Sequence, residues 1–285
     1  MAAAVSNAGG LGTLGLNAGQ TTVTADPRET AERLRAQIRK TRQLTDKPFG
    51  VNYILPSEGE RNPFTEACLS VILEENVSVL IVVGVANAVE ISRLKSLGLT
   101  VIFRELIPTI SGSKLAEHAG ADLLVATRSD EGGGAPNNRL GTFSVVPMIA
   151  DAVRIPVLAA GGIADSRAVR AAFALGAQGV FVGTRFVASK ECPASPVSKA
   201  QIVESASDST IALESGSLFY RSTPTAFMQN AIKDKQDAVP IHRFKIGILD
   251  GDLAQGINCV SSSISQIREV TSCEEIVREL ARGIF

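Results

Sequence analysis

The sequence predicts an α/β protein of the TIM-type (β/α)8 barrel class, because segments of strand and helix character alternate along its first two-thirds. The connections between these segments are short, which favours a parallel sheet with right-handed crossovers. One segment, VLIVVGV at residues 79–85, is an aliphatic run typical of a strand that is covered on both faces. We count seven such strands in the sequence, whereas a closed barrel of this class needs eight.

Each expected strand is a short apolar run bounded by glycine, proline or polar turn residues. The strands are expected at residues 11–16, 49–55, 79–85, 101–106, 121–127, 155–160 and 179–182. Helices are expected between them, at residues 29–43, 63–75, 88–97, 111–119, 143–152 and 166–175. Gly98, Gly120 and Gly176 follow three of these segments, as helix-terminating glycines do.

The stretch at residues 155–186 carries the clearest functional signal. A glycine turn follows each of its two strands, Gly161-Gly162 after the first and Gly183-Thr184 after the second. Glycine has no Cβ to shield its backbone N–H group, so such turns, together with the start of the following helix, can hold a phosphate. Either turn alone also suits an ordinary tight turn. The pair favours a phosphate site, because TIM-type barrels often bind phosphate after strands seven and eight.

The pattern changes after residue 186. Helices are expected at residues 198–206 and 225–234, and the segment between them is rich in serine and glycine. We interpret residues 189–263 as a helical lid on the substrate side, over the carboxyl ends of the strands. A last helix at residues 272–282 completes the outer ring, so the predicted barrel comprises residues 1–188 and 264–285.

Composition limits the classes of function. The net charge is −1 and the signs are interspersed, which argues against a nucleic-acid or anionic-membrane partner. The four cysteines form no metal-binding or disulfide motif, so we expect no metal site and a reducing compartment. The apolar stretch at residues 77–89 is too short to span a bilayer, and no secretory signal is recognisable. These observations predict a cytoplasmic protein that acts on a small molecule.

Several motifs together resemble the FMN-dependent barrel family of nitronate monooxygenases, formerly called 2-nitropropane dioxygenases. This family includes the FMN-dependent enoyl-ACP reductases of fatty-acid synthesis. The resemblance covers nearly the whole chain and is most specific in the SNAGGLG segment. The matching motifs are AVSNAGGLGTLG (4–15), PFGVN (48–52), KLAEHAGAD (114–122), VVPMIADAV (145–153), AAGGIAD (159–165) and LGAQGVFVGTRF (175–186).

The resemblance implies an FMN cofactor at the strand ends. The positions that match cofactor-binding residues of the family are Gly9, Gly10, Asn52, Gly161, Gly162, Gly183 and Thr184. The last four match the phosphate site, and Asn52 matches a strand residue that hydrogen-bonds the flavin. The alternative for Asn52, an ordinary polar residue that caps the strand end, is less favoured. Gly9 and Gly10 match a loop that lies against the cofactor. Arg185 is expected to pair with an acid beneath the barrel rather than with a ligand.

One departure from the family concerns its catalytic histidine, which follows a Gly-Gly pair after the sixth strand. Here the segment reads EGGGAPNN (131–138), with Gly134 or Ala135 at that position. Histidine suits the reaction because its pKa lies near neutrality, so it can exchange a proton beside the flavin N5. Of the two histidines present, His118 is expected on an outer helix. His242, in the lid, remains a candidate, and no catalytic residue is assigned.

Two further departures concern the start of the barrel and the lid. The family begins with a strand that ends in Pro-Met-Ala-Gly, whereas Met1 here directly precedes the helix that follows that strand. We therefore expect a barrel that lacks its first strand, with open edges that favour a homo-oligomer. The family's Gly-Gln-x-x-Gly segment is replaced by VSSSISQI (260–267).

The resemblance predicts an FMN-dependent oxidoreductase that oxidises alkyl nitronates with molecular oxygen. One alternative is an FMN- and NAD(P)H-dependent enoyl-ACP reductase, although the glycine-rich loops do not match a dinucleotide fingerprint. The other alternative is a truncated flavin-binding member of the family without catalysis, motivated by the missing strand and histidine.

Overall fold

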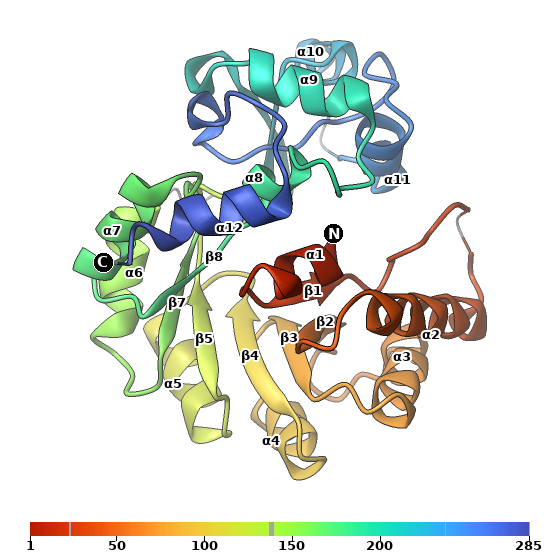
Figure 1. Ribbon diagram of the computed structural model, residues 1–285, viewed down its shortest axis with the longest axis vertical. Coiled ribbons are helices and arrows are strands. Elements are labelled where there is room, and N and C mark those ends of the chain that lie inside the picture. Colours follow the sequence, from red (N-terminus) through yellow and green to blue (C-terminus); the bar gives the residue numbers. More distant parts are fainter. Residues whose placement is uncertain (23, 137–139, 237, 285) are drawn as a thin grey trace. The chain divides into compact units, whose positions relative to one another are not determined.

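The computed structural model describes residues 1–22, 24–136, 140–236 and 238–284 of the chain. Its main element is a seven-stranded parallel sheet with the strand order β1-β2-β3-β4-β5-β7-β8, in a TIM-like α/β fold (Figure 1). The strands are β1 (Gly12–Leu14), β2 (Phe49–Ile54), β3 (Val79–Gly84), β4 (Thr100–Glu105), β5 (Leu123–Ala126), β7 (Val157–Ala160) and β8 (Gly179–Phe181). All seven expected strands form, and β1 and β8 are the last strands on the two sides of the sheet.

The chain divides into two compact units. The first comprises Met1–Val125 and Ile149–Val157, and the second comprises Ala126–Met148 and Leu158–Phe285. The predicted barrel (1–188 and 264–285) and lid (189–263) remain a prediction, as does the homo-oligomer.

Four of the five helices of the first unit, α2 to α5, begin where a side chain caps the first turn. The helices are α1 (Ala2–Asn7), α2 (Pro27–Leu44), α3 (Pro63–Glu74), α4 (Ala88–Ser96) and α5 (Ile110–His118). The side chains of Asp26, Asn62 and Asn87 accept hydrogen bonds from first-turn N–H groups of α2, α3 and α4. Pro27 and Pro63 stand at the first helical position, where the N–H that proline lacks would have no partner within the helix.

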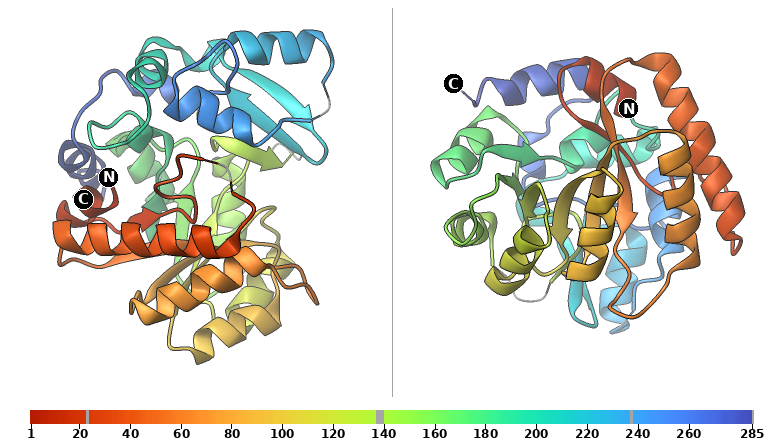
Figure 2. Two further views of the ribbon diagram at one scale, coloured as in Figure 1. Left: turned by 90° about the vertical axis from the view of Figure 1, so that its right-hand side faces the viewer. Right: turned by 90° about the horizontal axis from the view of Figure 1, so that it is seen from below.

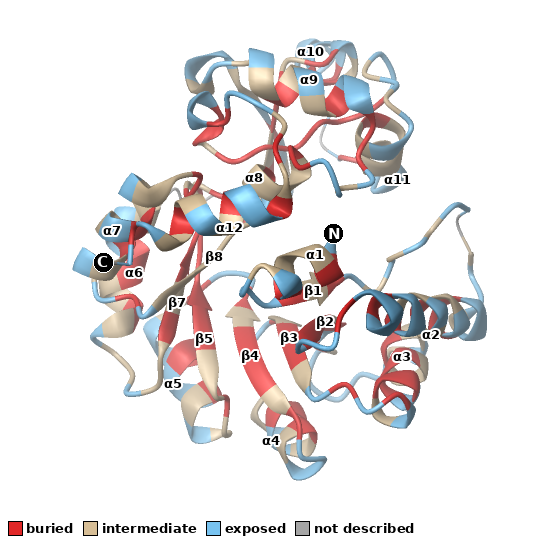
Figure 3. Ribbon diagram, in the orientation of Figure 1, coloured by how far each residue is buried: buried red, intermediate tan, exposed pale blue. Residues whose placement is uncertain are grey.

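The core of the first unit lies between its strands and helices (Figure 3). Leu80, Ile81 and Val82 of β3 are almost fully buried, because β3 is paired on both sides and covered on both faces. Helix α2 contributes Leu34 and Ile38, which are fully buried and lie one turn apart on the same face. The aliphatic run that predicts β3 is explained by the position of this strand inside the sheet, between β2 and β4.

An ion-pair network joins α2 to α3, and the two helices lie side by side (Figure 2). The buried carboxylate of Glu75, directly after α3, faces three arginines of α2. Arg35 Nη1 lies 3.2 Å and Arg39 Nη2 lies 2.8 Å from Glu75 Oε1, and Arg42 bonds both the carboxylate and the backbone carbonyl of Glu75. The hydrogen bond from Arg39, with a smaller contribution from Arg35, lowers the pKa of Glu75 against the opposing effect of burial.

We expect Glu75→Gln to lower the free energy of unfolding at pH 7 by about 1–2 kcal/mol, because the arginines lose their charged acceptor. A carboxyl whose pKa is lowered on folding stabilises the protein above its ordinary pKa of about 4.3. This stabilisation is lost as the pH falls through the lowered pKa, so the two proteins should become equally stable in acid. Urea unfolding between pH 3 and pH 7 measures the difference.

The control is Glu74→Gln, because Glu74 pairs with Arg35 at 2.7 Å but is largely exposed. This change should cost less than about 0.5 kcal/mol. Equal losses for the two variants at pH 7 would contradict the importance of the buried carboxylate.

The second unit contains a three-stranded antiparallel sheet that we did not predict. Its strand order is β6-β10-β9, with β6 (Gly133–Pro136), β9 (Ile211–Ser215) and β10 (Leu218–Ser222). Gly216, at φ +60°, lies in the turn between β9 and β10, and the buried Leu213 and Phe219 alternate with more exposed neighbours. This alternation around a glycine turn is a hairpin signal. The hairpin adds two strands to a region in which we expected only helices, and β6 lies in a segment that we expected to be a loop.

Helices at residues 198–206, 225–234 and 272–282 are confirmed as α9, α10 and α12, with slightly different ends. The remaining helical elements of the chain are α6 (Thr142–Ala150), α7 (Ser166–Ala174), α8 (Thr184–Val187), α9 (Pro196–Glu204), η1 (Ser207–Ser209), α10 (Ala226–Lys233), α11 (His242–Phe244), η2 (Lys245–Leu249), η3 (Ile264–Gln266) and α12 (Cys273–Ala281). Across the described ranges, every helix is too short or too polar to cross a membrane.

Candidate functional site

Two glycine turns lie next to each other in the second unit, at the carboxyl ends of β7 and β8. The strands pair in parallel with Ala160 opposite Phe181, so the segments that follow them leave the sheet at the same edge. Gly161 and Gly162 have φ values of +86° and +72°, a region that other residues rarely adopt. Gly183 directly precedes α8. The structure therefore brings together the four residues that the sequence assigns to a phosphate.

The backbone N–H groups of these turns are available to a ligand. Within the part of the chain that the structure describes, no acceptor takes the N–H of Gly162, Gly183 or Thr184. A Cβ atom built on Gly183 would meet no atom within 4 Å, so open space adjoins this turn. Free N–H groups beside open space suit phosphate oxygens. The turns thus fit the phosphate of FMN, the group that the sequence predicts.

A serine-rich segment, Val260 to Ser263, lies against both turns. Thr184 Oγ1 accepts a hydrogen bond from the N–H of Ser261 at 3.0 Å, and both residues are buried. Ser262 donates through its N–H to the backbone carbonyl of Asp130 at 3.0 Å. We noted this segment from the sequence only as a departure from the family. The feature of the sequence that could have indicated its contact with the turns is the run of three serines, whose hydroxyl groups can donate and accept hydrogen bonds.

Asp130 is a second site residue that we did not predict. Its Oδ2 accepts a hydrogen bond from the N–H of Thr142, the first residue of α6, at 2.6 Å. Its Oδ1 accepts from the hydroxyl of Ser262 at 2.9 Å. A Cβ atom on Gly162 would lie 3.4 Å from Asp130 Cβ, so this residue is in contact with the first glycine turn. One carboxylate thus links the turn, the serine segment and the start of α6.

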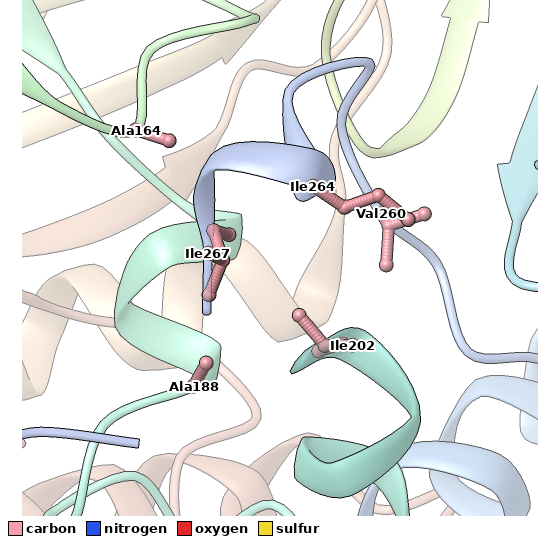
Figure 4. Close-up of a cluster of buried hydrophobic side chains, with 6 residues drawn as sticks. All are labelled: Ala164, Ala188, Ile202, Val260, Ile264 and Ile267. Atoms are coloured by element: carbon pink, nitrogen blue, oxygen red, sulfur yellow. The ribbon is translucent and has the colours of Figure 1, made fainter. Parts of the chain in front are cut away.

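An apolar cluster holds the segments around the turns (Figure 4). It joins a residue after the first turn and the residue after α8 with α9, the serine segment and η3. Its buried members are Ala164, Ala188, Ile202, Val260, Ile264 and Ile267. Because Ile202 and Val260 are fully buried, the cluster fixes the backbone on which the free N–H groups lie.

The position of the family's histidine lies in a packed sheet. Gly134 and Ala135 belong to β6, where they pair with Tyr220 and Phe219 of β10. A Cβ atom on Gly134 would lie 2.9 Å from Tyr220 Cε1, closer than real Cβ contacts allow, and Ala135 is fully buried. Burial raises the pKa of the Tyr220 phenol, so this ring stays protonated at neutral pH and does not replace an imidazole as a base. Asn137 and Asn138 lie outside the described residues.

Both histidines of the chain are exposed. His118 lies on α5, as expected, and its Nδ1 is 2.6 Å from the carbonyl oxygen of Lys114. His242 begins α11. The exposed position of His118 on α5 agrees with the outer helix on which we expected it.

Asn52, Gly9 and Gly10 lie in the first unit, whereas the phosphate-site residues lie in the second. Asn52 is half-buried in β2, opposite Ile81. Gly9 has φ +96° and a Cβ atom there would meet nothing within 4 Å. Their roles toward a flavin remain predictions.

Arg185 follows the second turn and points toward residues of the C-terminal segment. Its Nη1 donates to the backbone carbonyl of Glu269 at 3.3 Å. Burial lowers the pKa of Arg185, and the charges of Glu269, Glu275 and Glu279 oppose this effect. Arg185 thus bonds a carbonyl of an acidic residue, in place of the acid pairing that we expected. Among the described residues, no group of three or more His, Cys, Asp and Glu side chains is placed to hold a metal ion.

Comparisons with known proteins agree with the resemblance seen in the sequence. A family model described as nitronate monooxygenase matches residues 1–283. A probable nitronate monooxygenase from Staphylococcus haemolyticus (strain JCSC1435) is 33% identical over 249 residues, which cover 74% of this chain and 67% of that protein.

Two solved structures extend the similarity to the fold. The structure of FabK from Thermotoga maritima has a TM-score of 0.84 and 34% identity, and the match covers 99% of this chain and 87% of that one. Nitroalkane oxidase from Streptomyces ansochromogenes has a TM-score of 0.80 and 26% identity, and the match covers 99% of this chain and 92% of that one.

We expect Thr184→Val to lower the free energy of unfolding by about 1–3 kcal/mol, because the buried N–H of Ser261 loses its acceptor. Thr184→Ser keeps the oxygen and should cost less than about 1 kcal/mol. Chemical unfolding of the three proteins without ligand measures both changes. Equal stability of the valine and serine variants would show that the Thr184 hydroxyl does not hold the serine segment.

Proposed function

The chain belongs to the nitronate monooxygenase family of flavin-dependent oxidoreductases, and on this premise we propose that it binds FMN and oxidises alkyl nitronates with molecular oxygen. The observation that carries the proposal is the pair of neighbouring glycine turns with free N–H groups. It supports a phosphate-bearing cofactor independently of the family.

In this proposal the second unit holds the phosphate end of the cofactor. The N–H groups of Gly162, Gly183 and Thr184 donate to phosphate oxygens, and Gly161 allows the close approach of the backbone. Asn52 hydrogen-bonds the flavin ring, and Gly9 and Gly10 lie against it, as the resemblance implies. These residues bind and orient the cofactor, and none of them transfers a proton.

The residues at the histidine position determine which form of the substrate reacts. Bound FMN supplies the electron transfer between a nitronate and molecular oxygen. A neutral nitroalkane must first lose a proton from carbon, and Gly134 and Ala135 offer no base for this step. A nitronate has already lost that proton. We therefore assign the nitronate anion, not the neutral nitroalkane, as the substrate.

We expect the anion of 2-nitropropane to bleach the absorbance of bound FMN, under anaerobic conditions, at least about 100-fold faster than neutral 2-nitropropane. A positioned general base contributes about this factor or more to proton abstraction. Stopped-flow absorbance with freshly prepared anion and with the neutral compound measures both rates. Bleaching by neither compound would overturn the proposed oxidation.

Histidine variants control this experiment. His118→Gln should leave both rates unchanged, because the side chain is exposed on α5. His242→Gln tests the remaining candidate, and it should also leave both rates unchanged. A selective loss of the reaction with neutral nitroalkane in His242→Gln would identify a base that we do not assign.

We expect Gly183→Ala to raise the Kd for FMN about tenfold, because the added methyl group would enter the open space beside the free N–H groups. Gly183 has φ −113° and ψ −78°, just outside the α region of non-glycine residues, so the ligand-free variant should lose less than about 1 kcal/mol of stability, which chemical unfolding measures alongside the Kd. Quenching of FMN fluorescence measures the Kd. An unchanged Kd would place the phosphate elsewhere.

A second candidate function is the NAD(P)H-dependent reduction of an enoyl thioester. The similarity to the FabK structure, at 34% identity, favours keeping it. It predicts rapid anaerobic bleaching of bound FMN by NADH or NADPH, and a lack of bleaching by both would exclude it. A protein that binds FMN stoichiometrically but reacts with neither nicotinamides nor nitronates would instead be a flavin-binding member of the family without catalysis.

A further inference from the structure

The side chain of Asp130 lies against the proposed phosphate turn through its Cβ and Cγ atoms, which places its carboxylate close to that turn. A Cβ atom on Gly162 would be 3.4 Å from Asp130 Cβ and 3.8 Å from its Cγ, and one on Gly161 would be 3.3 Å from Asp130 Cβ. Both carboxylate oxygens accept hydrogen bonds, from the N–H of Thr142 at 2.6 Å and from the hydroxyl of Ser262 at 2.9 Å. A negative charge is therefore held in a fixed place beside the turn.

No cation of the described residues neutralises this charge directly. The ion pairs found among the residues that the structure describes do not include Asp130, and its two partners are a backbone amide and a hydroxyl, both neutral. Hydrogen bonds from neutral donors stabilise a carboxylate but leave its net charge in place. The field of this charge reaches an anion at Gly162, because partly buried charges are weakly screened.

Asp130 also occupies donors that an anion would otherwise use. The N–H of Thr142 is the first of α6, a helix of nine residues, and free amides at such a position attract anions. Ser262 belongs to the segment that contacts the second turn through Ser261 and Thr184. The carboxylate thus takes two donors from the group of residues around the turns, and it adds a like charge next to the remaining ones.

From this arrangement we infer that Asp130 is a specificity-determining residue that weakens the binding of phosphate dianions. The inference rests on the proposed function in one respect, namely that the dianion is the phosphate of FMN. It implies that the protein binds FMN more tightly than riboflavin, the same flavin without phosphate, but by a smaller factor than it would without the charge of Asp130. Removal of the charge should therefore increase the ratio of the riboflavin Kd to the FMN Kd.

The test compares the Kd values of FMN and riboflavin for the wild type and for Asp130→Asn. Asparagine keeps the size of the side chain and an oxygen that can accept from Thr142, so the loop keeps its anchor. We expect the variant to bind FMN about tenfold more tightly, while its Kd for riboflavin changes less than about twofold. Asp130→Ser, a second neutral variant, should shift the ratio of the two Kd values in the same direction.

The matched control is Asp208→Asn, which removes one negative charge from an exposed position on η1. It should leave both Kd values unchanged. Equal changes for the two flavins in the Asp130 variants would show a merely structural role and overturn the inference. Unchanged Kd values for both flavins would also overturn it.

Inorganic phosphate provides a readout that does not depend on flavin binding. A ligand that binds the folded protein raises the midpoint of thermal unfolding, so phosphate should raise it more in Asp130→Asn than in the wild type. If the wild type binds neither flavin, the proposed function fails, and this measurement alone decides the inference. Equal phosphate-dependent shifts in the two proteins would then overturn it, and a larger shift in the variant would support it.

Discussion

Parallel pairing of β7 with β8 is the constraint on which the candidate site depends. In a parallel pair both strands end at the same edge, so the register of Ala160 with Phe181 delivers two glycine turns side by side. A single turn offers few free N–H groups, whereas two neighbouring turns can surround a multiply charged anion. The apolar cluster around Ile202 and Val260 then holds these turns in place. A cradle made of backbone amides needs such support, because its donors cannot adjust as side chains do.

Local patterns predict much of this fold. Hydrophobic runs predict the seven strands, and capping residues predict where the helices between them begin. For example, the aliphatic run of β3 corresponds to a strand buried on both faces, and Asp26 and Pro27 mark the start of α2. The phosphate turns could be predicted because glycine pairs mark a backbone requirement. The hairpin of β9 and β10 was missed, although apolar and polar residues alternate around Gly216, because the surrounding serine and glycine residues suggested a loop.

The contacts that complete the site join residues far apart in the chain. Ser262 lies 132 positions from Asp130, and Ser261 lies 77 positions from Thr184. No periodicity or turn signal links such residues, since only the folded sheet places them together. A sequence therefore identifies the turns but not the charged and hydroxyl groups around them. For the same reason, a departure from a family motif, such as the serine run, can be noted without its structural consequence being visible.

The absence of the family's histidine and the packing of β6 against β10 are structurally linked, because the position that matches the histidine lies within β6. Because the Tyr220 ring fills the space next to Gly134, a single substitution cannot restore an imidazole there without moving that ring. Sheet packing thus disfavours an imidazole at Gly134, whereas the proposed phosphate cradle is built separately, from β7, β8 and the serine segment. The charge of Asp130 and the missing base affect different quantities, namely the affinity for the cofactor and the rate of a chemical step. The charge of Asp130 changes how tightly a phosphate is held, which is uniform binding and does not by itself accelerate a chemical step. The missing base changes a chemical step and leaves cofactor affinity alone. Affinity for the cofactor and reactivity toward the substrate can therefore vary independently in this protein.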